Sequence, residues 1–259
     1  MRVHVVSDVH GAARDLARAA DGSDVFVCLG DLVLFLDYDD PAGGILGDLF
    51  GADHARAYIA LRTANRFEEA GALSAAAWAS IGVRDHAERR AIMRTYVARQ
   101  YDDLFAAMPE PALLTYGNVD IPQLWGERLR PGHRVIGAGT VDVQGQRWGF
   151  VGGGLHSAMR TPYELAVEEF DAAVAGLGPV DVLFTHIPPA VAELTYDVVA
   201  RRFERGSVAL AEYVRAVQPR YHLFGHVHQP LAARRRIGRT ECINVGHFHA
   251  LREPFVVDL

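Results

Sequence analysis

Residues 3–10, which read VHVVSDVH, join a short apolar run to the polar triplet Asp8-Val9-His10. A run of four to eight residues rich in valine is typical of a buried strand. Ligands of α/β proteins bind in the loops that follow the carboxyl ends of strands. We therefore predict a strand at residues 3–6 and a ligand-binding loop directly after it.

The same arrangement recurs along the chain. Further strand-like runs lie at residues 25–29, 113–116, 148–151, 180–184 and 222–224, and helix-like segments lie at 12–20, 162–177 and 207–217. Their alternation predicts an α/β protein with covered sheets. Thr161, Pro162 and Glu164 form the pattern of a capping box, which predicts that one helix begins at residue 162.

Metal-ligand residue types follow five of these strands. After the Asp-x-His triplet come Gly30-Asp31, Gly117-Asn118-Val119-Asp120, Thr185-His186 and Gly225-His226-Val227-His228. Each motif alone is common, but five in series at strand ends indicate a metal site. Imidazole, carboxylate and amide ligands without thiolate favour Mn, Fe, Zn or Co over Mg or Ca.

The middle of the chain breaks this alternation. Residues 32–108 read mostly as helix, with Ala, Leu, Arg and Glu at helical spacing. We interpret residues 1–259 as a single domain in which 32–108 form a helical insertion. Its position after Asp31 leaves two roles open, a cap over the metal cleft or a contact between subunits.

Composition narrows the function classes. The 259 residues carry a net charge of -6, which argues against binding to nucleic acid. Cys28 and Cys242 lie in apolar stretches and read as core residues, and no leader or membrane-spanning run is apparent, so a cytoplasmic protein is expected. The triplet 234–236, all arginine, reads as the tip or edge of a hairpin.

The ordered motifs resemble those of the calcineurin-like metallophosphoesterase family, whose signature is Asp-x-His, Gly-Asp, Gly-Asn-His-Asp/Glu, His and Gly-His-x-His. Four of the five blocks match fully. The resemblance implies a sandwich of two mixed β-sheets flanked by helices. It also implies two divalent metal ions, manganese being favoured, of which one is held by Asp8, His10, Asp31 and His228 and the other by Asp31, Asn118, His186 and His226.

The resemblance implies hydrolysis of a small phosphate ester by a metal-bridging hydroxide. Val119 stands where the family commonly has a histidine that assists the leaving group, so phosphodiesters are favoured over monoesters. Asn118 and, as a substitute acid, His156 are the predicted catalytic residues. A nuclease and a metal-binding scaffold protein are the alternatives. His247 and His249 are expected at the rim of the site, and His4 and His222 within the core.

Overall fold

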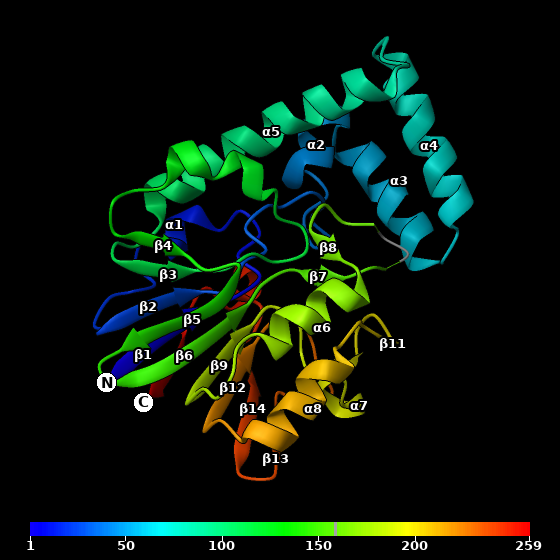
Figure 1. The fold of residues 1–259 in the computed structure, drawn as a ribbon. Helices are drawn as coiled ribbons and strands as arrows, with labels where there is room; N and C mark the ends of the chain where they lie inside the picture. The colour runs from blue at the N-terminus through cyan, green and yellow to red at the C-terminus, as the bar shows by residue number, and fades with distance from the viewer. Residues whose placement is uncertain (158–159) are drawn as a thin grey trace. The chain divides into compact units, whose positions relative to one another are not determined.

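The computed structural model describes residues 1–157 and 160–259, and the chain divides into two compact units (Figure 1). The first unit comprises residues 1–32 and 104–259, and the second comprises residues 33–103. The first unit contains two large sheets, whereas the second is helical.

The first sheet has five strands in the order β15-β1-β2-β3-β4. Strands β1 to β4 run parallel to one another, and β15 closes the edge antiparallel to β1. The bounds are β1 Arg2–Val6, β2 Val25–Cys28, β3 Ala112–Leu114, β4 His133–Val135 and β15 Phe255–Asp258.

The second sheet has six strands in the order β13-β14-β12-β9-β6-β5. Its four inner strands are parallel, and both edge strands are antiparallel to their neighbours. The bounds are β5 Ala138–Val143, β6 Gln146–Val151, β9 Val182–Thr185, β12 Tyr221–Phe224, β13 Arg234–Ile237 and β14 Thr240–Asn244.

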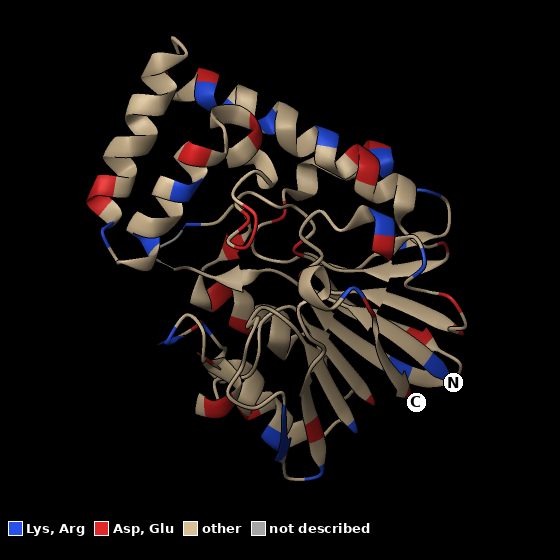
Figure 2. Cartoon of the chain, turned by 180° about the vertical axis from the view of Figure 1, so that it is seen from behind, with Lys and Arg blue, Asp and Glu red and all other residues tan. Residues whose placement is uncertain are grey.

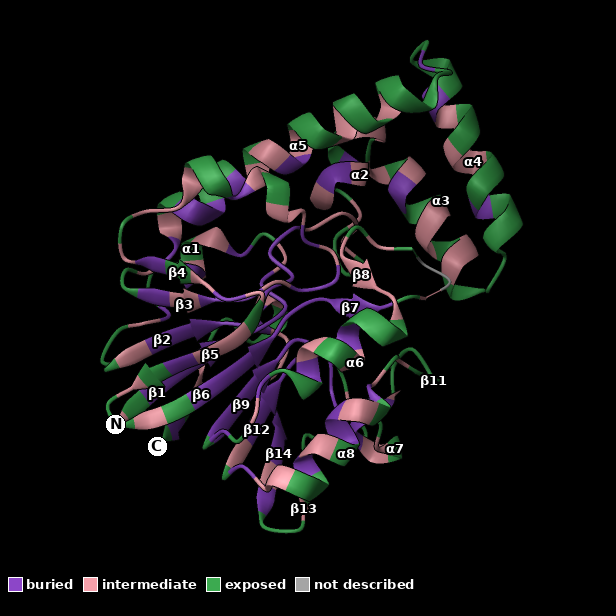
Figure 3. Cartoon of the chain, viewed as in Figure 1, coloured by how far each residue is buried: buried purple, intermediate pink, exposed green. Residues whose placement is uncertain are grey.

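The main core lies between the two sheets. Val3 and Val5 are alternate residues of β1, so both side chains point into this core. There they pack in one cluster with Trp148, Phe150 and other buried residues of the second sheet. The Phe150 ring stacks on the ring of Phe184, 4.9 Å away. Burial of each such side chain contributes roughly 1.5–3 kcal/mol. Figure 3 shows the inner strands of both sheets as buried.

Two helices cover the outer face of the six-stranded sheet, α6 (Val167–Ala175) and α8 (Val208–Val217) (Figure 1). Phe170 and Val214 on these helices pack with Phe224 of β12 in a second core. Ser207 caps α8, because its hydroxyl accepts a hydrogen bond from the Leu210 N–H at 3.1 Å. The remaining short elements are α1 Ala13–Leu16, η1 Pro122–Leu124, η2 Gly126–Arg128, β7 Gly154–Leu155, β8 Glu164–Leu165, α7 Ala192–Thr195, β10 Tyr196–Asp197, β11 Arg202–Phe203 and α9 Phe248–Leu251.

The prediction that a helix begins at residue 162 is wrong. Glu164 starts the short strand β8, and α6 begins at Val167. The Thr161 hydroxyl donates to the Glu164 carboxylate at 2.8 Å, but that carboxylate also accepts from the Ser157 N–H at 2.9 Å. The Glu164 carboxylate therefore binds Ser157 and Thr161 outside any helix, although its spacing from Thr161 also suits a capping box.

The second unit contains the helices α2 (Gly44–Phe50), α3 (Ala52–Thr63) and α4 (Phe67–Ser80) and most of α5 (His86–Ala107). The last turn of α5 belongs to the first unit. Phe50 and Trp78 pack edge to face with ring centroids 5.0 Å apart. The Gln100 side chain makes two hydrogen bonds with the backbone of Leu34, at 2.8 and 3.0 Å. These contacts hold the helices of this unit together.

The structure confirms the predicted fold class, a sandwich of two mixed sheets flanked by helices. Strands β2, β9 and β12 carry no charged residue, and charges gather on helices and at strand ends (Figure 2). Cys28 and Cys242 are free and buried, and the three arginines occupy edge strand β13. No helix within residues 1–157 or 160–259 has the length and apolar character needed to cross a membrane.

Candidate metal centre

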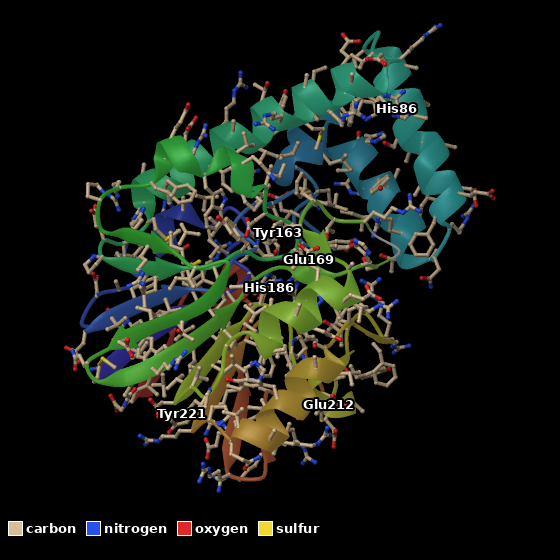
Figure 4. The ribbon with its side chains drawn as sticks, viewed as in Figure 1. His86, Tyr163, Glu169, His186, Glu212 and Tyr221 are labelled. Atoms are coloured by element: carbon tan, nitrogen blue, oxygen red, sulfur yellow. The ribbon has the colours of Figure 1, made fainter. Side chains whose placement is uncertain are left out.

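The candidate ligands lie in loops at the carboxyl ends of parallel strands. Asp8, Asp31 and Asn118 follow β1, β2 and β3 of the first sheet, and His186 and His226 follow β9 and β12 of the second. Figure 4 labels His186 at the end of β9 and Tyr221 at the opposite end of the neighbouring β12. The parallel topology explains why residues far apart in sequence meet at one edge of the sandwich.

Donor atoms from different loops approach one another closely. The Nε2 atom of His186 lies 2.9 Å from Oδ1 of Asn118 and 3.4 Å from Oδ2 of Asp31. The Nε2 atom of His228 lies 3.3 Å from Nε2 of His10 and 3.4 Å from Oδ1 of Asp8. Ligands of one ion bound at about 2.1 Å stand roughly 3.0–3.4 Å apart in octahedral or tetrahedral geometry. These separations therefore match those within a metal coordination sphere.

Three groups of side chains could each hold a metal ion, and some residues belong to two groups. Within each group, one ligand atom from every residue lies within 4.8 Å of the others. Two of these groups contain Asp31, and the third contains only imidazoles. The groups are Asp8, His10 and Asp31; Asp31, His186 and His226; and His10, His228 and His247. Asp31 thus belongs to both groups that contain carboxylates, as a bridging ligand would.

The backbone at four of the ligands is strained. Asp8, His10, Asp31 and His226 have φ values of 57°, 38°, 54° and 70°. A residue other than glycine in this left-handed region costs on the order of 1–3 kcal/mol, and such strain concentrates at functional sites. At all four positions the strain lies in the loop that directly follows a strand and carries the ligand.

Glycines precede three ligands because the loops pack too closely for a Cβ atom. A Cβ at Gly225 would lie 1.9 Å from Oγ of Ser7 and 2.3 Å from Oδ2 of Asp8, and one at Gly117 would lie 2.0 Å from Oδ1 of Asp31. The Gly-Asp, Gly-Asn and Gly-His motifs therefore have a steric cause.

Asp120 ties two ligand loops together. Its Oδ2 accepts hydrogen bonds at 2.8 Å from the N–H groups of Asp31 and Gly117, and its Oδ1 accepts one at 3.0 Å from that of Leu32. Burial, followed by the nearby Asp31 carboxylate, raises the pKa of Asp120 to about 7. The motif Gly117-Asn118-Val119-Asp120 predicted no such role for Asp120, although this residue lies two residues after Asn118 in the same loop.

Other hydrogen bonds orient the ligand side chains. Nδ1–H of His186 donates to the Leu29 carbonyl at 3.1 Å, so that Nε2 faces the other ligands. The Asn118 side chain donates from Nδ2 to Thr161 at 3.0 Å, so that its Oδ1 faces His186. Oδ2 of Asp8 accepts from the His226 N–H at 2.9 Å.

The carboxylates and histidines of the centre shift one another's pKa values. Although burial alone would raise it, the nearby His228, His186 and His10 hold the pKa of Asp8 well below its usual value. Burial opposes protonation of His186, but the Asp31 carboxylate outweighs it and raises the pKa of His186 to about 9. The buried carboxylates thus attract positive charge, which a cation also supplies.

The two positions linked to the leaving group differ in their relation to the ligand cluster, because Val119 contacts a ligand and His156 does not belong to any ligand group. His156 is exposed and belongs to none of the three ligand groups found in the described residues. It lines a pocket of about 640 Å³ together with Arg160, Thr161 and Arg205. Thr161 connects this pocket to the cluster through its hydrogen bond from Asn118. Val119 is half-buried, and its N–H donates to Oδ1 of Asp31 at 2.9 Å.

The remaining histidines take the following places. His4 and His222 lie buried within strands, and His222 donates from Nε2 to the Thr185 hydroxyl at 2.8 Å. His249 donates from Nδ1 to the His10 carbonyl at 2.7 Å. His247 lies among the ligands themselves, in the group with His10 and His228. The sequence predicted a place at the rim for His247, and its position after β14, which runs parallel to β12, explains why it lies beside these ligands.

Comparison with known proteins gives a likeness of fold. No family model matches the chain, and no curated protein matches it. The chain is similar to the crystal structure of TT1561 from Thermus thermophilus, with a TM-score of 0.52 and 12% identity over 99% of this chain and 98% of that one. A hypothetical protein from the same organism gives a TM-score of 0.44 and 15% identity over 95% of this chain and 76% of that one. At 12% identity the first likeness concerns the fold alone.

Proposed function

We propose that the protein is a two-metal phosphoesterase that hydrolyses a small phosphate ester. The observation that carries the proposal is the convergence of seven ligand-type side chains from both sheets. Donor atoms of six of them are separated by coordination-sphere distances, and a ring nitrogen of the seventh, His226, lies within 4.8 Å of the ligand atoms of Asp31 and His186. The same order of motifs in the sequence resembles that of calcineurin-like metallophosphoesterases. Function is thus inferred from the site, since a fold alone does not specify it.

The residues present fit a dinuclear metal site. Nε2 of His226 is buried and has no hydrogen-bond partner among the described residues, which is costly for a polar atom unless something else binds it. Imidazole, carboxylate and amide donors suit Mn, Fe, Zn or Co, with manganese the first ion to test. Asp8, His10, Asp31 and His228 would hold one ion, and Asp31, Asn118, His186 and His226 the other.

When bound, the two ions supply positive charge that binds phosphate oxygens and activates water for attack on phosphorus. The protein's own contribution is to orient the donors. The hydrogen bond from His186 to Leu29 fixes one imidazole, and the hydrogen bonds that Asp120 accepts fix the loops of Asp31 and Asn118. Such outer contacts keep the donors in place and so reduce the cost of assembling the site.

The substrate side of the site favours esters with good leaving groups. The half-buried Val119 cannot donate a proton, and His156 is exposed in the adjoining pocket. Phosphodiesters and activated esters are therefore preferred over alkyl monoesters. Arg160 and Arg205 line the same pocket and suit an anionic portion of a small substrate. The buried free cysteines accord with a reducing compartment, and we propose a cytoplasmic location.

Hydrolysis by purified protein loaded separately with Mn, Fe, Zn, Co or Mg tests this proposal. Bis-p-nitrophenyl phosphate and p-nitrophenyl phosphate are the substrates, and elemental analysis gives the metal content. We expect close to two ions per chain, metal-dependent hydrolysis of the diester, and loss of activity on chelation that metal restores.

His86→Ala is the control, because His86 is an exposed histidine at the start of α5, in the second unit (Figure 4). It should retain full metal content and activity. A protein that binds no metal under any loading condition, or one that binds metal but hydrolyses no ester in the panel, would overturn the proposal.

A further inference from the structure

His247 follows a parallel strand of the second sheet, as the candidate ligands His186 and His226 do. Strand β14 runs parallel to β12, and its last residue, Asn244, pairs with Phe224. His226 and His247 therefore follow neighbouring parallel strands at the same edge of the sheet. The backbone after β14 emerges beside the loop that carries His226 and His228.

The His247 ring packs directly against two candidate ligands. Its ring centroid lies 3.8 Å from that of His228, with the planes 12° apart, and 5.6 Å from that of His10. One ligand nitrogen from each of these histidines lies within 4.8 Å of the others. Nδ1 of His247 is buried and finds no hydrogen-bond partner in the described part of the chain. A buried nitrogen without a partner is costly unless an ion or water binds it, and three imidazole nitrogens this close together suit a transition-metal ion.

Hydrogen bonds fix this segment to both adjacent ligand loops. The Asn244 side chain donates to the carbonyls of Val227 at 2.9 Å and Gly225 at 3.3 Å. The Phe248 N–H donates to the Ser7 carbonyl at 3.0 Å. His247 is thus held between the loop of Asp8 and the loop of His228 by hydrogen bonds that do not involve its own ring.

We propose that His247 is an eighth ligand of the metal centre, completing a three-imidazole group with His10 and His228 around a divalent transition-metal ion. The inference rests on the proposed metal centre. A further neutral imidazole adds no charge but increases the nitrogen content of one site. That site should then prefer Co or Zn over Mn more strongly than the site of Asn118, where an amide oxygen replaces an imidazole.

The test must separate ligation from ring stacking. His247→Phe keeps an aromatic ring to stack on His228 but has no nitrogen, whereas His247→Ala removes both. Cobalt(II) and manganese(II) affinities are measured by titration against a chromophoric chelator, and proton NMR of the cobalt protein counts the strongly shifted ring N–H signals of bound histidines. His86→Ala serves as the matched control for loss of a surface histidine.

For a ligating His247 we expect both variants to lose cobalt affinity at one site by about tenfold or more, with a smaller loss for manganese. Both should also lose one shifted N–H signal, while His86→Ala loses none. Circular dichroism of the metal-free variants checks folding, and His247→Gln replaces His247→Phe should the latter not fold.

Unchanged cobalt affinity and an unchanged set of shifted signals in His247→Phe would overturn the role of His247 while the metal centre itself stands. A cobalt affinity that falls in His247→Ala and is restored in His247→Phe would also overturn it, because stacking alone then explains the effect. A wild-type protein without bound metal would instead overturn the proposed function and this inference with it.

Discussion

The carboxylate of Asp120 accepts a hydrogen bond from the backbone N–H of Asp31 at 2.8 Å, although 89 residues separate them along the chain. The same Oδ2 atom accepts from the N–H of Gly117. One buried carboxylate thus joins the loop after β2 to the loop after β3. Asp120 thus helps to set the positions of Asp31 and Asn118 relative to each other, which makes it a positioning residue of the proposed centre.

Asp120→Asn should loosen the centre without removing a ligand. One carboxylate oxygen becomes an N–H donor that faces a backbone N–H, at a cost of roughly 1–3 kcal/mol. We expect a lower free energy of unfolding, measured by urea denaturation of the metal-free protein. We also expect metal affinity to fall by about 10–100-fold, as for other residues that orient ligands. Wild-type metal affinity in this variant would contradict the role of Asp120 as a positioning residue.

Asp31→Asn should abolish hydrolysis more completely than His228→Ala. Asp31 belongs to both ligand groups that contain carboxylates, whereas His228 belongs to the imidazole group alone. We expect the first variant to lose most of both ions and the second to lose chiefly one, as measured by elemental analysis. Equal residual activity and equal metal content in the two variants would contradict a bridging role for Asp31.

Hydrolysis by the wild-type protein should depend steeply on the leaving group. General acid catalysis supplies about 10²- to 10⁴-fold in rate, and Val119 cannot provide it. The measurement is kcat for esters with a range of leaving-group pKa values, under saturating metal and with the chemical step rate-limiting. If His156 serves as the acid from its exposed position, His156→Ala should slow alkyl esters selectively and spare nitrophenyl esters.

Val119→His is the complementary variant in that experiment. It should make the dependence on leaving-group pKa shallower if the added imidazole reaches the leaving oxygen. A shallow dependence in the wild-type protein that neither substitution alters would show that the missing histidine has no catalytic consequence. The absence of a general acid at Val119 would then no longer explain a preference for diesters, and that preference would be withdrawn.

The metal-free protein should lose stability in mild acid partly through His222. Burial lowers the pKa of this side chain to about 3, so the unfolded chain binds a proton below about pH 6.5 that the folded chain does not. Its contribution to stability is therefore complete above about pH 6.5 and falls as the pH decreases toward 3. The slope contributed is at most about 1.4 kcal/mol per pH unit.

Urea denaturation at pH 5, 6 and 7 measures this effect. His222→Gln keeps an N–H donor for the Thr185 hydroxyl but does not titrate. Its stability should fall less between pH 7 and pH 5 than that of the wild-type protein. Parallel pH profiles for the two proteins would show that His222 does not bind a proton on unfolding.

Much of the sandwich could be predicted because strand signals are local. The runs around Val3 and Phe224 are short, apolar and flanked by polar loops, and both form strands. The predicted start of α6 is wrong because the side chains of Thr161 and Glu164 can form the same hydrogen bond in a loop as at the start of a helix. Local spacing states which hydrogen bonds are available, but tertiary contacts decide which backbone forms them.

The sequence motifs predicted only those residues of the site that directly follow strands. Side chains such as His186 follow strands directly, so parallel topology gathers them without further information. The place of His247 depends on β14 lying beside β12, and the role of Asp120 depends on the distance between two loops. Both are properties of the assembled sheets, which strand patterns alone do not specify.

The left-handed backbone at Asp31 also restricts which chemistry this position can hold. Aspartate, asparagine and histidine enter that conformation several-fold more readily than most residues other than glycine. The centre is therefore built from the side chains that tolerate its geometry as well as from those that bind metal. Asp31→Glu would preserve the charge and the carboxylate, yet at the φ of 54° it would strain the chain and carry its oxygens one methylene farther out. The backbone conformation at Asp31 thus limits which residues can replace it, and it disfavours even a glutamate, which carries the same carboxylate donor.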